Sequence, residues 1–168
     1  SINSELVVKS MSFLENAEIE RIRKRFIEAG ISKNRLIMLP WAKNHEEHIS
    51  DYNKIDVALD TVPYGGATTT AEALKMGIPV ICLQGKNMVG SLSSSILHSA
   101  KLNNLINHSE EDYIACAIKL YNQGKRSTIE RNIFAENIAK SPLNNSRRVS
   151  MGLENAFLQC LKGLHHLQ

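Results

Sequence analysis

The sequence contains no apolar run near the roughly 20 residues that a membrane-spanning helix requires. Its polar amino-terminal region lacks the apolar segment of a signal peptide. Lysine and arginine number 20 against 17 aspartates and glutamates, so the net charge of +3 supplies no strong field for nucleic acid or an anionic membrane. We therefore expect a chain with neither membrane nor nucleic-acid partners.

Cysteine is also scarce in this chain. Cys82, Cys116 and Cys160 are odd in number and widely spaced within apolar runs, a pattern that favours buried reduced thiols over a disulfide framework. Because disulfides are rare in reducing compartments, we expect a cytoplasmic location.

Signature motifs of several enzyme classes are missing. The sequence has neither the G-x-G-x-x-G fingerprint of dinucleotide binding nor the G-x-x-x-x-G-K-[ST] loop of nucleoside triphosphatases. It has no nucleophile elbow, no Ser-His-Asp order and no paired catalytic carboxylates, so nothing in it supports a hydrolase. The residues that remain indicate a binding site without an identifiable catalytic residue.

What the chain does have is 43% hydrophobic residues in a length of 168, enough for one substantial core. Short apolar runs rich in branched residues alternate with segments of helical period, as in buried parallel strands joined by helices. Strands are predicted at residues 6–8, 36–39, 57–59, 80–83 and 105–106. Helices are predicted at residues 17–29, 69–76, 91–100, 111–122, 127–139 and 145–164, with stops at Gly30 and Gly77 and caps at Asn44 and Ser109.

This order of elements predicts an α/β fold in a single domain over residues 1–168. A Rossmann-like doubly wound parallel sheet would occupy about residues 5–107, and a C-terminal extension of helices about residues 109–164. In such a sheet the ligand site lies beyond the carboxyl ends of the strands. Candidate site residues should therefore follow the predicted strands.

The last predicted helix carries an apolar stripe that something must cover. The stripe consists of Val149, Leu153, Ala156, Phe157, Cys160, Leu161 and Leu164. Either the stripe packs on this domain's own sheet, or part of it docks on a partner domain. In the second case, an isolated chain would hide the helix in a homodimer or leave an apolar patch exposed.

The strongest candidate site is the segment DVALDTVPYGGATTTAEALKMGIPV, in which a polar loop joins a strand to a helix. Gly65 and Gly66 lack Cβ atoms, so a bulky anion could approach the main chain closely. The helix start has free N–H groups and a partial positive charge, and the hydroxyls of Thr68 and Thr69 would add donors. Glu72, one turn later, could accept hydrogen bonds from ribose. The alternative is an ordinary Gly-Gly turn followed by a helix cap.

A second candidate is the segment WAKNHEEH, which directly follows the strand predicted at residues 36–39 and so also lies at the carboxyl edge of the sheet. Lys43, His45 and His48 could contact a base or a phosphate. The two histidines have the spacing of one helix face, but no further ligand accompanies them, so we expect no metal site.

Weaker candidates lie nearby. Lys9 ends the first strand at the same edge, where it could face phosphate or simply be solvated. Tyr64 could form a wall of the cleft or serve only in packing. Gly65 and Thr70 belong to the same weaker set.

The stretch LIMLPWAKNHEEHISDYNKIDVALDTVPYGGATTTAEALKMGIPVICLQG resembles the C-terminal catalytic lobe of the O-linked N-acetylglucosamine transferase and SPINDLY-like family, in particular its bacterial members with tetratricopeptide repeats. The resemblance covers nearly the whole chain. It implies a GT-B fold, in which two Rossmann-like lobes face a cleft and the C-terminal lobe holds most of the donor. It also implies inverting transfer of N-acetylglucosamine, or glucose, from uridine diphosphate (UDP) to a protein, with no metal or other cofactor.

The resemblance also implies roles for individual residues. Ala67, Thr68 and Thr69 align with the helix start that binds the diphosphate, and Glu72 aligns with an acidic ribose contact. His48 aligns with a histidine that packs against uracil. The backbone around Lys43 aligns with the segment that reads the base edge, and His45 falls where some relatives have a lysine near the phosphates.

Two positions depart from the pattern of animal members. Ala67 replaces a histidine, and Asp51 stands where those enzymes have an arginine near the base. The N-terminal lobe, the repeats, and a lysine and a glutamine that help hold the diphosphate would lie upstream of Ser1. We therefore expect weak donor binding and no transfer by this lobe alone.

Together these observations predict that the chain binds the UDP moiety of a nucleotide sugar, most simply UDP-N-acetylglucosamine, as the donor half of an inverting protein glycosyltransferase. Its partners would be that donor, the missing lobe and repeats, and a protein acceptor. One alternative is a noncatalytic GT-B-like interaction module that docks a partner through its C-terminal helix. Another is an epimerase or hydrolytic enzyme on the same scaffold, which would need a carboxylate and a histidine at the anomeric carbon.

Overall fold

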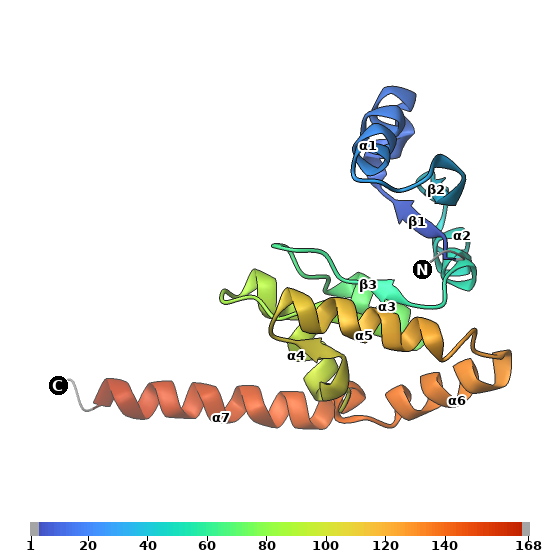
Figure 1. Ribbon diagram of the computed structural model, residues 1–168. Coiled ribbons are helices and arrows are strands. Elements are labelled where there is room, and N and C mark those ends of the chain that lie inside the picture. The colour runs from blue at the N-terminus through green and yellow to red at the C-terminus, as the bar shows by residue number, and fades with distance from the viewer. Residues whose placement is uncertain (1–3, 166–168) are drawn as a thin grey trace.

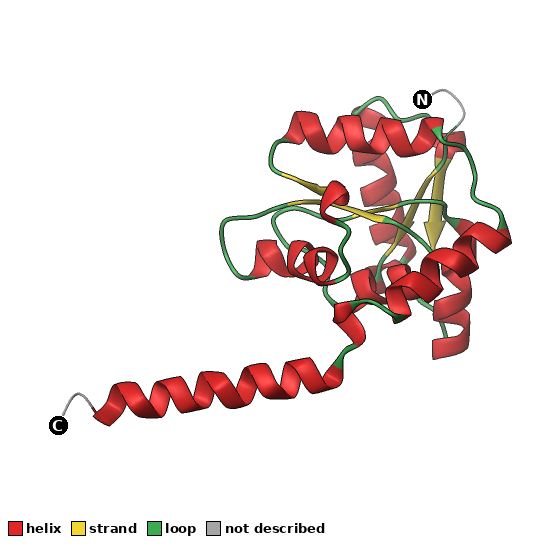
Figure 2. Ribbon diagram, turned by 90° about the horizontal axis from the view of Figure 1, so that it is seen from below, coloured by secondary structure: helices red, strands yellow, loops and turns green. Residues whose placement is uncertain are grey.

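The computed structural model describes residues 4–165, with side chains through residue 162, and consists of parallel strands alternating with helices (Figures 1 and 2). The strands are β1 (Leu6–Lys9), β2 (Leu36–Leu39), β3 (Ala58–Leu59), β4 (Val80–Leu83) and β5 (Ile106–Asn107). The helices are α1 (Asn16–Glu28), α2 (His45–Ser50), α3 (Thr68–Lys75), α4 (Leu92–Ser99), α5 (Glu110–Asn122), α6 (Thr128–Ala139) and α7 (Ser146–His165). The α/β class is confirmed, and every predicted strand and helix has a counterpart.

The strands form two hydrogen-bonded groups. β1 pairs with β2 in parallel, from Leu6 opposite Leu36 to Lys9 opposite Leu39. In the second group β4 lies between β3 and β5, again in parallel. The expected continuous sheet is interrupted between the groups, because no strand of residues 4–165 pairs with members of both. Figure 1 shows β1, α1 and β2 standing apart from the larger body that contains β3, with α2 beside the connection.

Local signals set the ends of the helices. Gly30 and Gly77 have φ values of 91° and 78°, the left-handed conformation in which glycine ends a helix. At the other ends, the side chains of Asn44 and Ser109 each accept a hydrogen bond from the amide three residues further on. The predicted stops and caps are therefore confirmed.

The hydrophobic core lies around β4. Val80, Ile81 and Cys82 of this strand are buried, and Leu74 of α3 and Leu97 of α4 are fully buried beside them. Partly buried side chains of α5 and α6 pack against the same cluster. Because α3 contributes to this core, its amino end has a fixed position at the edge of the second strand group.

The three cysteines are free thiols in different environments. Cys82 is buried in β4, and burial raises its pKa to about 11. Cys116 is half-buried, whereas Cys160 is exposed. The prediction of buried thiols is wrong for Cys160, because it lies on a helix that the other described residues do not cover.

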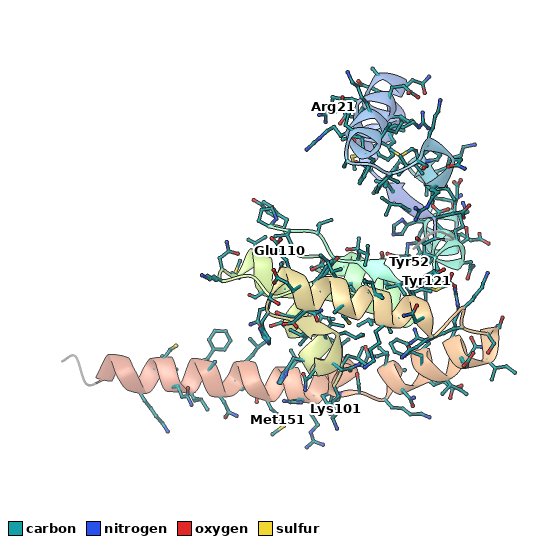
Figure 3. The ribbon with its side chains drawn as sticks, in the orientation of Figure 1. Arg21, Tyr52, Lys101, Glu110, Tyr121 and Met151 are labelled. Carbon is teal, nitrogen blue, oxygen red and sulfur yellow. The ribbon has the colours of Figure 1, made fainter. Side chains whose placement is uncertain are left out.

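That helix, α7, extends away from the body of the molecule, and its side chains, including the labelled Met151, project outward (Figures 1 and 3). Val149, Leu153, Phe157 and Leu161 of the predicted stripe are more than half exposed. The alternative in which the stripe packs on this domain's own sheet is therefore wrong. Leu164 lies outside the described side chains. None of the helices in the described part of the chain is long and apolar enough to cross a membrane.

Replacing Leu74 by alanine should lower the free energy of unfolding by about 2–5 kcal/mol, because the side chain is 0% exposed and its removal leaves a cavity. Urea titration followed by circular dichroism measures this loss. The matched control is Leu14→Ala, where the leucine is 72% exposed and the expected loss is below about 0.5 kcal/mol. Equal losses for the two variants would contradict this description of the core.

We expect the isolated chain to bind a hydrophobic dye through α7 or to bury that helix in a dimer, because the exposed apolar face is costly in water. Replacing Phe157 and Leu161 together with serine should lower the dye fluorescence or the dimer fraction. Glu154→Ser on the same helix is the control and should change neither. A monomer by light scattering that binds no dye would contradict the prediction.

Candidate functional site

The start of α3 lies at the carboxyl edge of the second strand group. β3 ends at Leu59, and residues 60–67 lead into the helix at Thr68. The N-cap residue, Ala67, has no side chain that accepts a hydrogen bond, and no side-chain cap is present. Ala67, Thr68 and Thr69 are exposed. This helix start therefore combines an uncapped first turn with the positive end of the helix dipole in an accessible position.

The loop before α3 uses its polar groups internally. The Gly66 N–H donates to Asp60 Oδ1 at 2.7 Å, and the Gly65 N–H donates to the Val89 carbonyl at 3.3 Å. Tyr64 is 70% exposed and makes its contact through its carbonyl, which accepts from the Thr61 hydroxyl at 2.7 Å. The two glycines therefore shape the loop, while their amides are already paired.

The three threonines at the start of α3 divide into two kinds. Thr68 and Thr69 are exposed, whereas Thr70 is 2% exposed and its hydroxyl contacts the Ser93 hydroxyl at 2.8 Å. The structure thus places Thr68 and Thr69 at the accessible end of the helix and Thr70 behind the loop.

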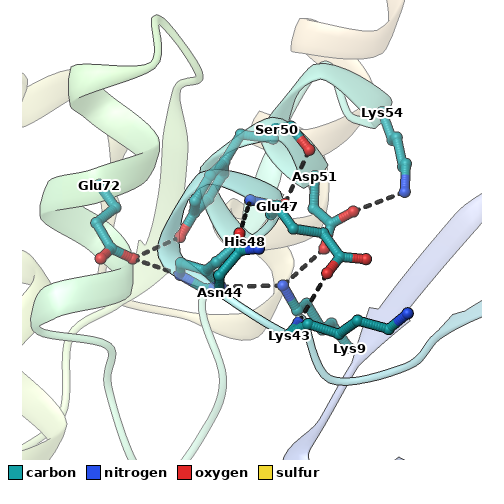
Figure 4. A network of polar contacts seen from close by, with 10 residues as sticks. Lys9, Lys43, Asn44, Glu47, His48, Ser50, Asp51, Lys54 and Glu72 are labelled. Carbon is teal, nitrogen blue, oxygen red and sulfur yellow. Dashed lines mark hydrogen bonds and ion pairs between the residues drawn. The ribbon is translucent and has the colours of Figure 1, made fainter.

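His48 of α2 lies between a lysine and a glutamate (Figure 4). Its Nδ1 is 2.9 Å from Lys9 Nζ, and its Nε2 is 2.9 Å from Glu72 Oε2. Because the lysine ammonium can only donate, Nδ1 accepts, and the ring proton is assigned to Nε2, which donates to the carboxylate. The structure therefore brings together three residues that the sequence analysis selected separately.

Lys9 is bound on its other side by Asp51, the first residue of the 3-10 turn η3 (Asp51–Lys54). Lys9 Nζ lies 2.7 Å from Asp51 Oδ2, and Lys54 Nζ lies 2.6 Å from Asp51 Oδ1. Burial raises the pKa of Asp51, but the hydrogen bonds from Lys54 and Lys9 outweigh burial and hold the pKa below its ordinary value. Lys9 is therefore an internal partner of the network and not a solvated lysine.

Tyr52 is a candidate site residue that the sequence patterns did not single out. Its hydroxyl donates to Glu72 Oε2 at 3.1 Å and lies 3.3 Å from the Thr69 carbonyl. Burial, together with the negative charge of Glu72, raises the pKa of Tyr52, so the hydroxyl stays protonated. The signal in the sequence was its position four residues after His48, one turn further along the same surface.

The remaining candidates border this network. His45 is exposed, and its ring centroid lies 6.4 Å from that of His48. Trp41 flanks His48 at 6.1 Å, and Lys9 Nζ lies 5.7 Å from the centroid of the indole ring. Lys43 is exposed, and its N–H donates to Glu47 Oε2 at 2.7 Å. Lys43 and His45 thus lie beside the network without entering it.

Among the described residues there is no group of three histidine, cysteine or carboxylate side chains that could hold a metal ion. Both ring nitrogens of His48 are already occupied by Lys9 and Glu72. What the arrangement offers is an uncapped helix start next to a carboxylate and a neutral imidazole. Such a surface suits a ligand that carries both an anionic group and hydroxyl groups.

Comparisons with known proteins agree on one family. A family model described as "Glycosyl transferase family 41" matches residues 5–153. The chain is 31% identical over 159 residues to the probable UDP-N-acetylglucosamine–peptide N-acetylglucosaminyltransferase SPINDLY of Hordeum vulgare, covering 92% of this chain and 16% of that protein. It is 28% identical over 101 residues to the UDP-N-acetylglucosamine–peptide N-acetylglucosaminyltransferase of Caenorhabditis elegans, covering 60% of this chain and 9% of that protein.

A solved structure is similar as well. A mutant O-GlcNAc transferase of Thermobaculum terrenum matches with a TM-score of 0.70 and 32% identity, over 96% of this chain and 29% of that chain. The chain thus spans less than a third of the structure and about a sixth of the SPINDLY relatives that it matches.

The Asp51 carboxylate should stabilise the fold in a pH-dependent way. Its folded-state pKa lies below the ordinary value of 3.8, so its contribution is fully present above that value and is lost as the pH falls through the folded-state pKa. Urea unfolding from about pH 7 to about pH 3 should show that wild type has a higher unfolding free energy than Asp51→Asn. This advantage should be constant from about pH 7 to about pH 4 and should shrink at lower pH.

The control for this comparison is Glu46→Gln, at an exposed position on α2, the helix that directly precedes Asp51. Its difference from wild type should stay small and should not follow the profile of Asp51→Asn. A wild-type advantage over Asp51→Asn that grows with acidification would contradict the assigned ion pairs.

Proposed function

This chain belongs to glycosyl transferase family 41, and from that premise we propose that it binds the UDP moiety of a nucleotide sugar at the amino end of α3. The observation that carries the proposal is the uncapped, exposed first turn of α3 beside Glu72 and His48. The relatives' names support the identity of the ligand, because they contain UDP-N-acetylglucosamine.

The diphosphate would lie at the helix start. Its oxygens would accept from the first-turn amides and from the hydroxyls of Thr68 and Thr69, while the helix dipole favours the negative charge. Ala67 would contribute only its backbone. Lys9 is already paired with Asp51 and His48, so the amides and hydroxyls, and not this lysine, would provide the phosphate contacts on this chain. This arrangement supports binding without a metal ion.

The nucleoside would lie toward α2. Oε2 of Glu72 accepts from both His48 and Tyr52, which fixes the carboxylate and leaves Oε1 to accept from ribose hydroxyls. The rings of His48 and Trp41 supply flat apolar surfaces against which a base can pack. Lys43 and His45 would lie at the outer edge of the base.

We further propose that the complete protein transfers N-acetylglucosamine from its UDP donor to a protein acceptor, as the names of its relatives state for them. The helix dipole at the start of α3 would stabilise the negative charge that develops on the leaving diphosphate. The remaining catalytic parts would come from a second lobe outside these 168 residues.

A second candidate role rests on α7. Its exposed apolar face supports a noncatalytic module that docks a partner. The two roles differ in their dependence on α3. If Thr68→Ala with Thr69→Ala leaves transfer by the full-length protein intact, the phosphate role is wrong and the docking role gains support.

Titration with UDP, followed by two-dimensional NMR of backbone amides, tests the proposal on this chain. We expect the amides of residues 67–70 to shift, and Thr68→Ala with Thr69→Ala to weaken UDP binding about 10-fold or more, because hydrogen bonds to charged groups are lost. Uridine, which has no phosphate, should bind both proteins equally.

The matched control is Thr128→Ala, since Thr128 is also an exposed threonine that opens a helix, in that case α6. This variant should bind UDP as wild type does. Glu72→Gln should weaken uridine and UDP alike, because ribose is common to both. An absence of amide shifts at α3 with millimolar UDP would refute the proposal.

A further inference from the structure

The loop before α3 is held at Gly66 on both of its backbone polar groups. The Gly66 N–H donates to Asp60 Oδ1 at 2.7 Å, and the Gly66 carbonyl accepts from the Ser93 hydroxyl at 2.7 Å. Asp60 directly follows β3, whereas Ser93 lies in the first turn of α4, 27 residues after Gly66. Two separate elements therefore fix one glycine.

The hydroxyl contacts behind the loop have one consistent direction. Ser93 has a single hydroxyl proton and donates it to the Gly66 carbonyl, so Thr70 must be the donor in its 2.8 Å contact with Ser93. Both side chains are buried, with Ser93 0% and Thr70 2% exposed. The result is a short buried chain of hydrogen bonds that runs from Thr70 through Ser93 to Gly66.

The surroundings of Gly66 leave the loop little conformational freedom. A Cβ at Gly66 would lie 2.6 Å from Thr70 Oγ1 and 2.8 Å from Thr69 Oγ1, so a side chain at this position would force these threonines to shift. The Gly66 peptide directly precedes the first turn of α3, so its orientation sets the direction of the amides that follow. The buried hydroxyls of Thr70 and Ser93 thus fix the orientation of the peptide that leads into the exposed amino end of α3.

We propose that Ser93 is a positioning residue for the diphosphate site: it acts with Thr70 by fixing the Gly66 peptide, so that the amides and hydroxyls of residues 67–69 converge on one anion. Ser93 itself does not touch the ligand. The inference rests on the proposed function, since it assigns to Ser93 a role in UDP binding at the same site. It extends the site to α4, a helix that contributes no contact to UDP in that proposal.

The test uses two variants that break the chain of hydrogen bonds. Ser93→Ala removes the hydroxyl that binds the Gly66 carbonyl, and Thr70→Val removes the donor to Ser93 with little change of shape. Each should weaken UDP about 5-fold to 10-fold, the loss expected for a misplaced set of hydrogen bonds, and leave uridine unchanged. The measured quantity is the ratio of UDP affinity to uridine affinity, from NMR titration of the full 168-residue chain.

Matched variants separate positioning from folding. Thr70→Ser restores the hydroxyl and should recover the wild-type ratio. Ser94→Ala is the control, because Ser94 is 5% exposed in the same helix but donates to the Ser91 carbonyl and not to the loop. It should lower stability without changing the ratio. In the ligand-free protein, Ser93→Ala should also shift the amide resonances of residues 66–69, whereas Ser94→Ala should leave them in place.

The outcomes are distinguishable. If wild type binds neither UDP nor uridine, the proposed function fails and this inference fails with it. If wild type binds UDP and Ser93→Ala binds it equally well, this inference alone fails. Equal loss of UDP and uridine in Ser93→Ala would reduce Ser93 to a residue of the fold and would also overturn the proposal. If Ser93→Ala does not fold, Thr70→Val and Thr70→Ser decide the question.

Discussion

The candidate site depends on a helix that begins without a side-chain cap. Most helices satisfy their first amides with a serine, threonine, aspartate or asparagine side chain, as α2 and α5 do here. α3 begins after Ala67, which offers no such acceptor, so its positive end remains available to an external anion. The helix keeps this unsatisfied end because its other side is anchored: Thr70, Ala73 and Leu74 are buried against the core around β4.

A second constraint is the pairing of charges beside that helix. The Asp51 carboxylate pairs with both Lys9 and Lys54, and His48 links this cluster to Glu72. The network also connects the two strand groups, because Lys9 belongs to β1 whereas Glu72 belongs to α3. A lysine engaged in this way supports the architecture, so in the proposed function an anion would be bound by neutral donors. Neutral donors avoid the cost of removing an ammonium group from water.

Much of the fold was predictable, because strands, helices and their ends are encoded by signals a few residues apart. Gly30 and Gly77 end helices through their own backbone conformation, and Asn44 and Ser109 cap the helices that follow them. The interruption between the two strand groups and the exposure of α7 were not predictable in this way. Both depend on which surfaces pack against one another in the folded protein. The spacing of apolar residues along α7 is the same whether or not another surface covers them.

For the site, the sequence by itself determined the loop with its two glycines, the threonines that follow it, and the candidates Glu72 and His48. Only the tertiary structure decided that Thr70 faces Ser93 while Thr68 and Thr69 face outward, and that Lys9 pairs with Asp51, 42 residues away. The physical reason is range: caps, turns and helical periods act between near neighbours in the chain. Which polar groups meet across 23 to 42 residues depends instead on how the packed elements place them.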